Sequence, residues 1–228
     1  MRDDYYKLDN PAWYALTETH AGFAIGNDKV KRYRPDIVAF AAYQRGSKNI
    51  FPQLDEIVAV NESFFIIGEI SSLASNYIVE SILPCVQMIC SKQIQTHITV
   101  SIEKLNETDD EDILTLINLV QPGYYKKGTR LMGDYFGIRQ NEQLVSATGE
   151  RMRTNGLTEI SAVVTHPDFT GRKYAQQLVA HVANKNLAEG LTPFLHVAAT
   201  NKRAINIYEL LGFVKRRGID FTRLKRVG

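Results

Sequence analysis

The sequence has few cysteines, no long apolar run and no excess of one charge. The chain of 228 residues contains two cysteines, Cys85 and Cys90. Their C-x4-C spacing without a neighbouring histidine pair gives neither a disulfide framework nor a good zinc site, so we expect two buried free thiols and no metal. No stretch approaches 18 apolar residues, and the first ten residues lack the apolar core of a secretory signal. We therefore expect a cytoplasmic protein that does not span a membrane.

The composition is that of a soluble globular chain. Hydrophobic residues make up 44% and charged residues 23%, and the formal net charge is only +2. Such a balance argues against a nucleic acid or a membrane surface as partner. The length suffices for one large domain or two small ones.

The first hundred residues give weak structural signals. Residues 55–70, DEIVAVNESFFIIGEI, show two apolar runs broken at Asn61-Glu62 and predict a hairpin. Residues 81–90, SILPCVQMIC, are apolar but interrupted by Pro84, so their type stays ambiguous. A strand is predicted over residues 97–102.

A polar stretch then predicts a helix start. Thr108 and Glu111 have the T-x-x-E spacing of a capping box, and three aspartates nearby favour the positive end of a helix. We expect a helix over about residues 109–119, ending before Pro122-Gly123.

The second half alternates strands and helices. Residues 134–139 and 143–152 flank the polar QNE segment as a predicted hairpin, and residues 157–165 follow as a strand. A helix from about Gly171, a strand at 193–199 and a helix at 201–212 come next, and residues 213–224 predict two final strands about Arg217-Gly218. This order predicts an α/β fold with a mixed sheet and helices packed against it.

The segment THPDFTGRKYAQQL, residues 165–178, joins a strand to a helix. The first turn of a helix has unpaired N–H groups and partial positive charge, so it can bind an anion. The spacing matches neither a Walker loop nor a dinucleotide fingerprint. Taken alone, the segment fits an anion site and an ordinary connection equally well.

Two motifs together give a family resemblance. The pattern N-x-x-A-x-x-x-Y-x-x-x-G-F is complete in Asn201, Ala204, Tyr208, Gly212 and Phe213. The loop pattern [RQ]-x-x-G-x-[GA] is partial, because Thr170 and Lys173 replace two of its residues while Ala175 matches. Residues 134–217 thus resemble the core of a GNAT-superfamily acyl-CoA N-acyltransferase, and residues 8–26 resemble the N-terminal part of bacterial two-part members.

The resemblance implies a fold and a domain arrangement. We expect an α+β, GNAT-like sheet that is mixed, mostly antiparallel and twisted, flanked by helices, with an additional N-terminal α/β half-domain. Residues 1–100 would form this degenerate or accessory half, which is expected to shape the acceptor site or an oligomer contact such as a homodimer. Residues 101–228 would form the acetyltransferase domain.

The resemblance also implies an acetyl-CoA site. The backbone of Val163, Val164 and Thr165 would pair with the pantetheine arm. The pyrophosphate would lie on the loop and first helical turn, with Asn201 near the cofactor; the loop residues are Thr170, Gly171, Arg172, Lys173, Tyr174, Ala175 and Gln176. The alternatives are packed strand residues, solvated basic side chains and a simple helix cap. Lys173 puts a side chain where the family usually has glycine.

Two residues are implied in the chemistry. Tyr208 would protonate the departing thiolate, as general acid catalysis requires, although a core tyrosine is the alternative. Glu159 would accept the proton of the amine, with Glu150 and His196 as other candidates, and it fits a salt-bridge partner equally well. His166, before Pro167, is interpreted as structural. The basic residues of 215–226 could face an acidic substrate or the CoA 3′-phosphate, but a solvated strand face is favoured.

The implied function is an N-acetyltransferase that moves the acetyl group of acetyl-CoA to a primary amine on a small molecule, amino acid or peptide. Direct attack in a ternary complex is expected, since no Cys or Ser nucleophile accompanies the motif. The alternative is a non-catalytic acyl-CoA-binding or regulatory module, which the altered loop motivates. The acceptor is not identified by the sequence.

Overall fold

A computed structural model describes residues 5–70 and 72–228, so residues 1–4 of the predicted N-terminal half and Ser71 lie outside the description. The strands are β1 (Ala24–Gly26), β2 (Val30–Tyr33), β3 (Phe40–Tyr43), β4 (Ser63–Ile67), β5 (Tyr77–Ile89), β6 (Glu103–Leu105), β7 (Tyr135–Gln140), β8 (Gln143–Thr154), β9 (Leu157–Thr165), β10 (Thr192–Ala198) and β11 (Val214–Arg226). The α-helices are α1 (Pro11–Thr17), α2 (Phe51–Asp55), α3 (Asp110–Val120), α4 (Tyr174–Ala188) and α5 (Lys202–Leu210). Short 3-10 turns are η1 (Tyr6–Asp9), η2 (Ala21–Phe23), η3 (Glu107–Asp109), η4 (Lys127–Met132) and η5 (Pro167–Phe169).

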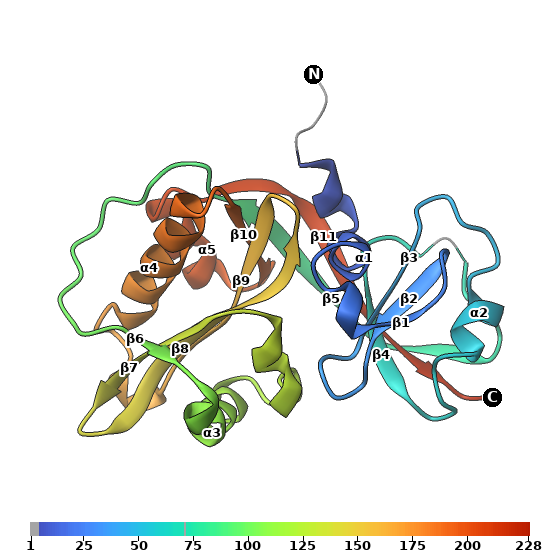
Figure 1. Cartoon of the computed structure of the whole chain (residues 1–228), viewed down its shortest axis with the longest axis horizontal. Helices are drawn as coiled ribbons and strands as arrows, with labels where there is room; N and C mark the ends of the chain where they lie inside the picture. Colours follow the sequence, from blue (N-terminus) through green and yellow to red (C-terminus); the bar gives the residue numbers. More distant parts are fainter. Residues whose placement is uncertain (1–4, 71) are drawn as a thin grey trace.

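All described strands belong to one sheet, in the order β1-β2-β3-β4-β11-β5-β10-β9-β8-β7-β6. Within it only β3·β4 and β9·β10 are parallel, and the other described pairs are antiparallel. Helices lie on the sheet, and the N-terminal elements form a separate group beside β4 (Figure 1). The predicted fold class, a mixed and mostly antiparallel sheet with an N-terminal α/β half-domain, is confirmed.

The two halves are joined by the long central strands β5 and β11. These strands pair along residues 77–89 and 214–226. Beyond this pair, β11 also bonds to β4 on the N-terminal side, from Phe221 to Lys225, and β5 bonds to β10 from Cys85 to Ile89. The last strand of the chain therefore completes the sheet of the first half.

The two faces of the sheet bury different helices. Successive residues of a strand point to opposite faces. Accordingly Leu195 of β10 packs in a cluster with α4 and α5, whereas its neighbour Phe194 packs in a cluster with α1. Helix α3 packs over β8 and β9 in a further cluster that includes Val164. Among the described residues, no helix combines the length and the apolar character needed to cross a membrane.

The elements of the second half agree closely with the sequence. The β7–β8 hairpin turns at Asn141 and Glu142, which both have positive φ, as expected for a tight hairpin turn. The predicted strand at 157–165, helix α4, strand β10 and helix α5 are all present. These elements have local signals, namely periodicity, turn residues and helix caps.

Other predictions were wrong. Residues 55–70 form no hairpin, because only β4 is a strand there and its partners are the distant β3 and β11. Residues 97–102 form no strand; that segment crosses α4, where the Gln177 side chain accepts a hydrogen bond from the Thr99 amide. The helix start is capped by Asn106 and Asp109 rather than by Thr108 and Glu111.

The two long central strands were also misread. Residues 213–224 predict two strands, but β11 is one strand with a register shift between Lys215 and Arg217, which accommodates the extra residue as a bulge. The ambiguous segment around Pro84 belongs to β5. Pro84 lies one residue outside the stretch that pairs with β10, where its missing N–H costs no bond to that strand.

Gly149 on β8 gives a test of this packing. A Cβ at this position would lie 2.3 Å from Cε1 of the buried Tyr135 ring. Overpacking of this kind costs about 1–3 kcal/mol, so Gly149→Ala is expected to lower the free energy of unfolding by about 2 kcal/mol in urea denaturation. Gly218→Ala is the control, since its Cβ would meet only Cys85 O at 3.9 Å. Equal stability of the two variants would contradict the packing around Tyr135.

Candidate functional site

The site begins where β9 and β10 separate. These parallel strands pair only from Leu157↔Thr192 to Glu159↔Phe194, although β9 runs on to Thr165 and β10 to Ala198. Beyond Glu159 the backbones of β9 and β10 no longer pair with each other. The His196 side chain is only 2% exposed while the residue as a whole is partly exposed, so its main chain lies open in the gap.

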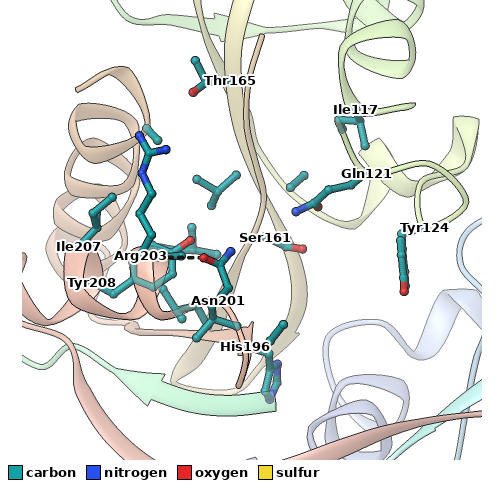
Figure 2. A pocket seen from close by; sticks show the side chains of 18 of the residues that line it. Ile117, Gln121, Tyr124, Ser161, Thr165, His196, Asn201, Arg203, Ile207 and Tyr208 are labelled. Atoms are coloured by element: carbon teal, nitrogen blue, oxygen red, sulfur yellow. Dashed lines mark hydrogen bonds between the residues drawn. The ribbon is translucent and has the colours of Figure 1, made fainter. Parts of the chain in front are cut away.

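A cavity of about 720 Å³ occupies this gap and reaches both faces of the sheet. Consecutive residues Leu195, His196 and Val197 all line it, although Leu195 and Val197 belong to the α4–α5 side and His196 contacts Phe221 on the other. Figure 2 shows Asn201, Arg203 and Tyr208 on one side of the strand and Gln121 and Tyr124 on the other. Two ligands can therefore meet in the gap from opposite faces.

Strand β9 carries a bulge where it borders the cavity. The register shifts between Ala147↔Val164 and Gly149↔Ser161, and Ala162 has the left-handed φ of 52°. Ser161, Ala162 and Val163 line the cavity in succession, as Leu195, His196 and Val197 of β10 do, because the cavity reaches both faces of these strands. Of the predicted pantetheine residues, Val163 and Thr165 also line the cavity, while the Val164 side chain is buried under α3.

The predicted phosphate loop lies at one end of the cavity. All seven loop residues named from the sequence line it: Thr170, Gly171, Arg172, Lys173, Tyr174, Ala175 and Gln176. Helix α4 begins here with no side-chain cap and no acidic residue in its first turn, so its first amides and helix dipole are open to an anion. The Arg172 guanidinium lies over the Phe169 ring at 4.8 Å from the centroid.

Lys173 stands where the family pattern usually has glycine, and its backbone adopts the left-handed conformation. It is the N-cap of α4 with φ 61° and its side chain is exposed. This φ is the conformation in which glycine is favoured. The lysine therefore pays a local conformational cost but leaves the loop in the shape that a glycine would give.

The second motif places its two polar residues at the cavity. The Asn201 side chain caps α5 by accepting a hydrogen bond from the Ala204 amide at 3.0 Å. One turn further, Tyr208 lines the cavity and is only 9% exposed. Burial raises the pKa of Tyr208 to about 12, and no described residue hydrogen-bonds its hydroxyl. Its phenol is thus protonated at neutral pH and has a proton to donate.

Glu159 lies beside the cavity but does not line it. Its carboxylate accepts two hydrogen bonds from Arg151, at 2.8 and 2.6 Å, and one from His196 Nδ1 at 2.7 Å. Burial alone would raise the pKa of Glu159, but the Arg151 guanidinium and His196 outweigh it and hold that pKa at about 2. Such a carboxylate is a weak base, so its surroundings favour a role in positioning Arg151 and His196.

The tautomer of His196 is assigned by its partners. Gln87 Nε2 donates to Leu8 O and Gln87 Oε1 accepts from Arg216, which fixes the orientation of the amide. Gln87 Nε2 therefore also donates to His196 Nε2, at 3.0 Å, and the ring proton is on Nδ1, facing Glu159. Both ring nitrogens are occupied, so His196 offers no free lone pair to an amine in this arrangement.

The remaining candidates named from the sequence lie elsewhere. Glu150 is fully buried, binds Lys185 and the Asp134 amide, and does not line the cavity. His166 accepts a hydrogen bond from the Asp168 amide at 3.3 Å, as expected for a structural turn residue. Basic residues of β11 pair with carboxylates on neighbouring elements, as in Arg217–Asp9 and Arg223–Glu80.

Several lining residues were missed by sequence reasoning. They come from the end of α3, from η4 and from the central strands, and they are Leu83, Cys85, Ile117, Gln121, Tyr124, Tyr125, Thr129, Arg151, Ser161 and Phe221. No local motif marks them, because strands far apart in the sequence bring them together. Cys85 and Ser161 are new candidate nucleophiles. Burial raises the pKa of Cys85 to about 11, and no described residue accepts a hydrogen bond from the Ser161 hydroxyl.

Comparison with known proteins agrees with this geometry. The family model "FR47-like protein", which is related to GNAT, matches residues 135–222. The structure of a GNAT-family protein from Novosphingobium aromaticivorans is 29% identical, covers 97% of this chain and 99% of its own, and superposes with a TM-score of 0.90. A GCN5-related N-acetyltransferase from Kribbella flavida shares the fold at 13% identity and a TM-score of 0.65, with 95% and 96% coverage. Among curated proteins, none matches this chain.

The family match over residues 135–222 and the fold over nearly the whole chain both resemble those of GNAT acetyltransferases, in agreement with the two-part architecture expected from the sequence.

Lys173→Gly tests the loop. Removing a left-handed non-glycine residue is expected to raise the free energy of unfolding by about 1 kcal/mol. We also predict that affinity for acetyl-CoA, measured by titration calorimetry, is kept or increased. Lys48→Gly, in an exposed loop outside the cavity, controls for loss of one positive charge. A large loss of affinity specific to Lys173→Gly would show that the lysine side chain itself holds phosphate.

The ion pair of Glu159 gives a second test. The pKa of Glu159, about 2, lies below the usual 4.5 of a glutamate, so the pair contributes stability above about pH 4.5 that is lost as pH falls toward 2. At 1.36 kcal/mol per pKa unit this amounts to roughly 3 kcal/mol. In Glu159→Gln, acid denaturation curves should lose this component between pH 5 and pH 2, as estimated from the same linkage. An unchanged pH dependence would contradict the ionised, paired state.

Proposed function

We propose that this protein is an N-acetyltransferase that moves the acetyl group of acetyl-CoA to a primary amine. The single observation that supports it best is the cavity between β9 and β10. At one face of the sheet the cavity is bordered by the uncapped N-terminus of α4, the unpaired backbone of β9 and the protonated Tyr208. It continues to an open region at the other face. A donor and an acceptor can thereby be bound at the same time.

The donor is proposed to lie along the α4–α5 side. Its pyrophosphate would accept hydrogen bonds from the amides of 171–175, with the Arg172 guanidinium adding positive charge. Its pantetheine arm would pair with the open backbone of β9 near Val163 and Thr165. This placement would bring the thioester sulfur toward Tyr208 and the thioester carbon toward the opening on the other face.

The reaction is proposed to be a direct attack. The amine nitrogen bonds to the thioester carbon, the carbon–sulfur bond breaks, and the amine loses one proton. Tyr208 donates its proton to the departing thiolate and is reprotonated from solvent. A covalent acyl-enzyme is disfavoured, because the Cys85 thiol has a raised pKa and Ser161 has no described base.

The amine must be neutral to attack. The charged residues that line the cavity are all cationic: Arg151, Arg172, Lys173 and Arg203. Nearby positive charge disfavours an ammonium ion and lowers the pKa of a bound amine. We propose that this field yields the neutral amine and that its final proton leaves through water, because the Glu159 carboxylate is held by Arg151 and His196 outside the cavity lining.

The decisive experiment combines binding with turnover. Acetyl-CoA should raise the melting temperature, and a panel of primary amines should release free CoA thiol in the presence of acetyl-CoA. A melting shift without thiol release on any amine would favour the alternative, a non-catalytic acyl-CoA-binding module. Absence of a shift would refute both proposals.

Tyr208→Phe tests the proton donor. The change keeps the ring and its contact with Phe213 but removes the hydroxyl. General acid catalysis contributes about 10²–10⁴-fold, so kcat should fall by about 100-fold while acetyl-CoA binding is retained. Tyr6→Phe, on the surface outside the cavity, is the matched control. Equal kcat for Tyr208→Phe and wild type across the pH range would remove this role.

A further inference from the structure

The acceptor end of the cavity has a distinctive lining. On the face opposite α4 and α5 it is formed largely by apolar and aromatic groups, including Leu83, Tyr124, Tyr125 and Phe221. The charged residue on this side is Arg151, and none of the described lining residues of the whole cavity is Asp or Glu. A site that binds a simple cationic amine is expected to contain a carboxylate, or an aromatic cage without a nearby cation. This site instead contains the cationic Arg151.

Arg151 is held with part of its guanidinium unused. The Nε and Nη2 atoms of Arg151 donate to the two carboxylate oxygens of Glu159. Glu159 therefore occupies the edge of the guanidinium that Nε and Nη2 form. The guanidinium lies over the rings of Phe40 and Phe221, at 5.0 and 5.7 Å from their centroids, and these contacts fix its plane. No described residue accepts a hydrogen bond from Nη1. The end edge, formed by Nη1 and the second hydrogen of Nη2, therefore stays available.

Such an edge matches a carboxylate. Arginine presents donors in a rigid fork that binds two carboxylate oxygens side by side. Because the Arg151 side chain is only 15% exposed, a bond to it is little weakened by competing water. Glu159 lies outside the lining, so a ligand in the cavity meets the guanidinium rather than its counter-ion.

On the basis of the proposed acetyltransferase function, we propose that the acceptor is an amino carboxylate with an apolar or aromatic side group. Arg151 binds its carboxylate, and Tyr124, Tyr125, Leu83 and Phe221 contact its side group. The amine of the same molecule faces the thioester. Arg151 is thus a specificity-determining residue, and Glu159 positions it.

The test compares amines that differ only in the carboxylate. L-Phenylalanine is compared with phenethylamine and with phenylalaninamide, and L-leucine with 3-methylbutylamine, each at saturating acetyl-CoA. The kcat/KM values are expressed per neutral amine, because the pKa values of these amines differ. A hydrogen bond to a charged group is stronger than one between neutral groups, so the amino acids should be favoured by about tenfold or more. Equal or higher values for the decarboxylated amines would overturn the proposal.

The variant that tests the residue is Arg151→Lys, which keeps the charge and loses the fork. The preference for amino acid over decarboxylated amine should fall toward one. Arg153→Lys, two residues further along β8 and outside the cavity, is the control and should keep the preference. If Arg151→Lys fails to fold, the neutral double variant Arg151→Gln/Glu159→Gln avoids an unpaired buried charge. Persistence of the preference in a folded variant would contradict the role of Arg151.

A binding measurement separates this proposal from the transfer reaction itself. The enzyme–CoA complex is titrated with 3-phenylpropionate and with its neutral amide, neither of which can be acetylated on an amine. Tighter binding of the carboxylate, lost in the Arg151 variant, supports the recognition site even if no amine in the panel reacts. Equal binding of the two probes overturns the recognition site, whether or not acetyl transfer occurs.

Discussion

The site depends on one constraint: two neighbouring parallel strands stay paired for only three residues. β9 and β10 are each held on their outer side, by β8 and by β5, so they can diverge without leaving the sheet. The divergence exposes main-chain groups that a sheet normally satisfies internally. A bound molecule with its own amide groups can supply the missing hydrogen bonds. The bulge at Ala162 lies beside the same space, where it interrupts the register between β8 and β9.

A buried polar network connects the two halves of the chain at this point. It runs from Leu8 through Gln87 and His196 to Glu159 and Arg151, and each bond crosses between different segments. Buried charges are tolerated only when they are paired and hydrogen-bonded, and here every member has such partners. The network fixes the His196 tautomer and the Arg151 plane together. The N-terminal half thus contributes to the geometry of the cavity without supplying the loop at residues 170–176.

Some residues of the candidate site could be predicted from the sequence and others could not. Asn201, Tyr208 and the loop at 170–176 lie within one strand–helix–strand–helix segment, where caps, turns and periodicity are local, and the structure brings them to one cavity as expected. The surroundings of Glu159 could not be predicted, because Arg151 and His196 reach it through sheet pairing. The same applies to Leu83 and Phe221, which lie opposite each other across β5 and β11, 138 residues apart in the chain. Side chains whose role depends on long-range register carry no local signal.

The path of β11 has a consequence for how the protein comes to be folded. Strands β1 to β4 are synthesised early, yet the partner of β4 on its other edge is the last strand of the described chain. Until then β4 presents an open edge, and Phe40 and Phe65 lack the Phe221 ring that closes their cluster. Non-local pairing of this kind is slow and leaves edges that can associate wrongly. The core of the first half is therefore completed only when the last described strand pairs with β4, whereas the loop at residues 170–176 belongs to the second half.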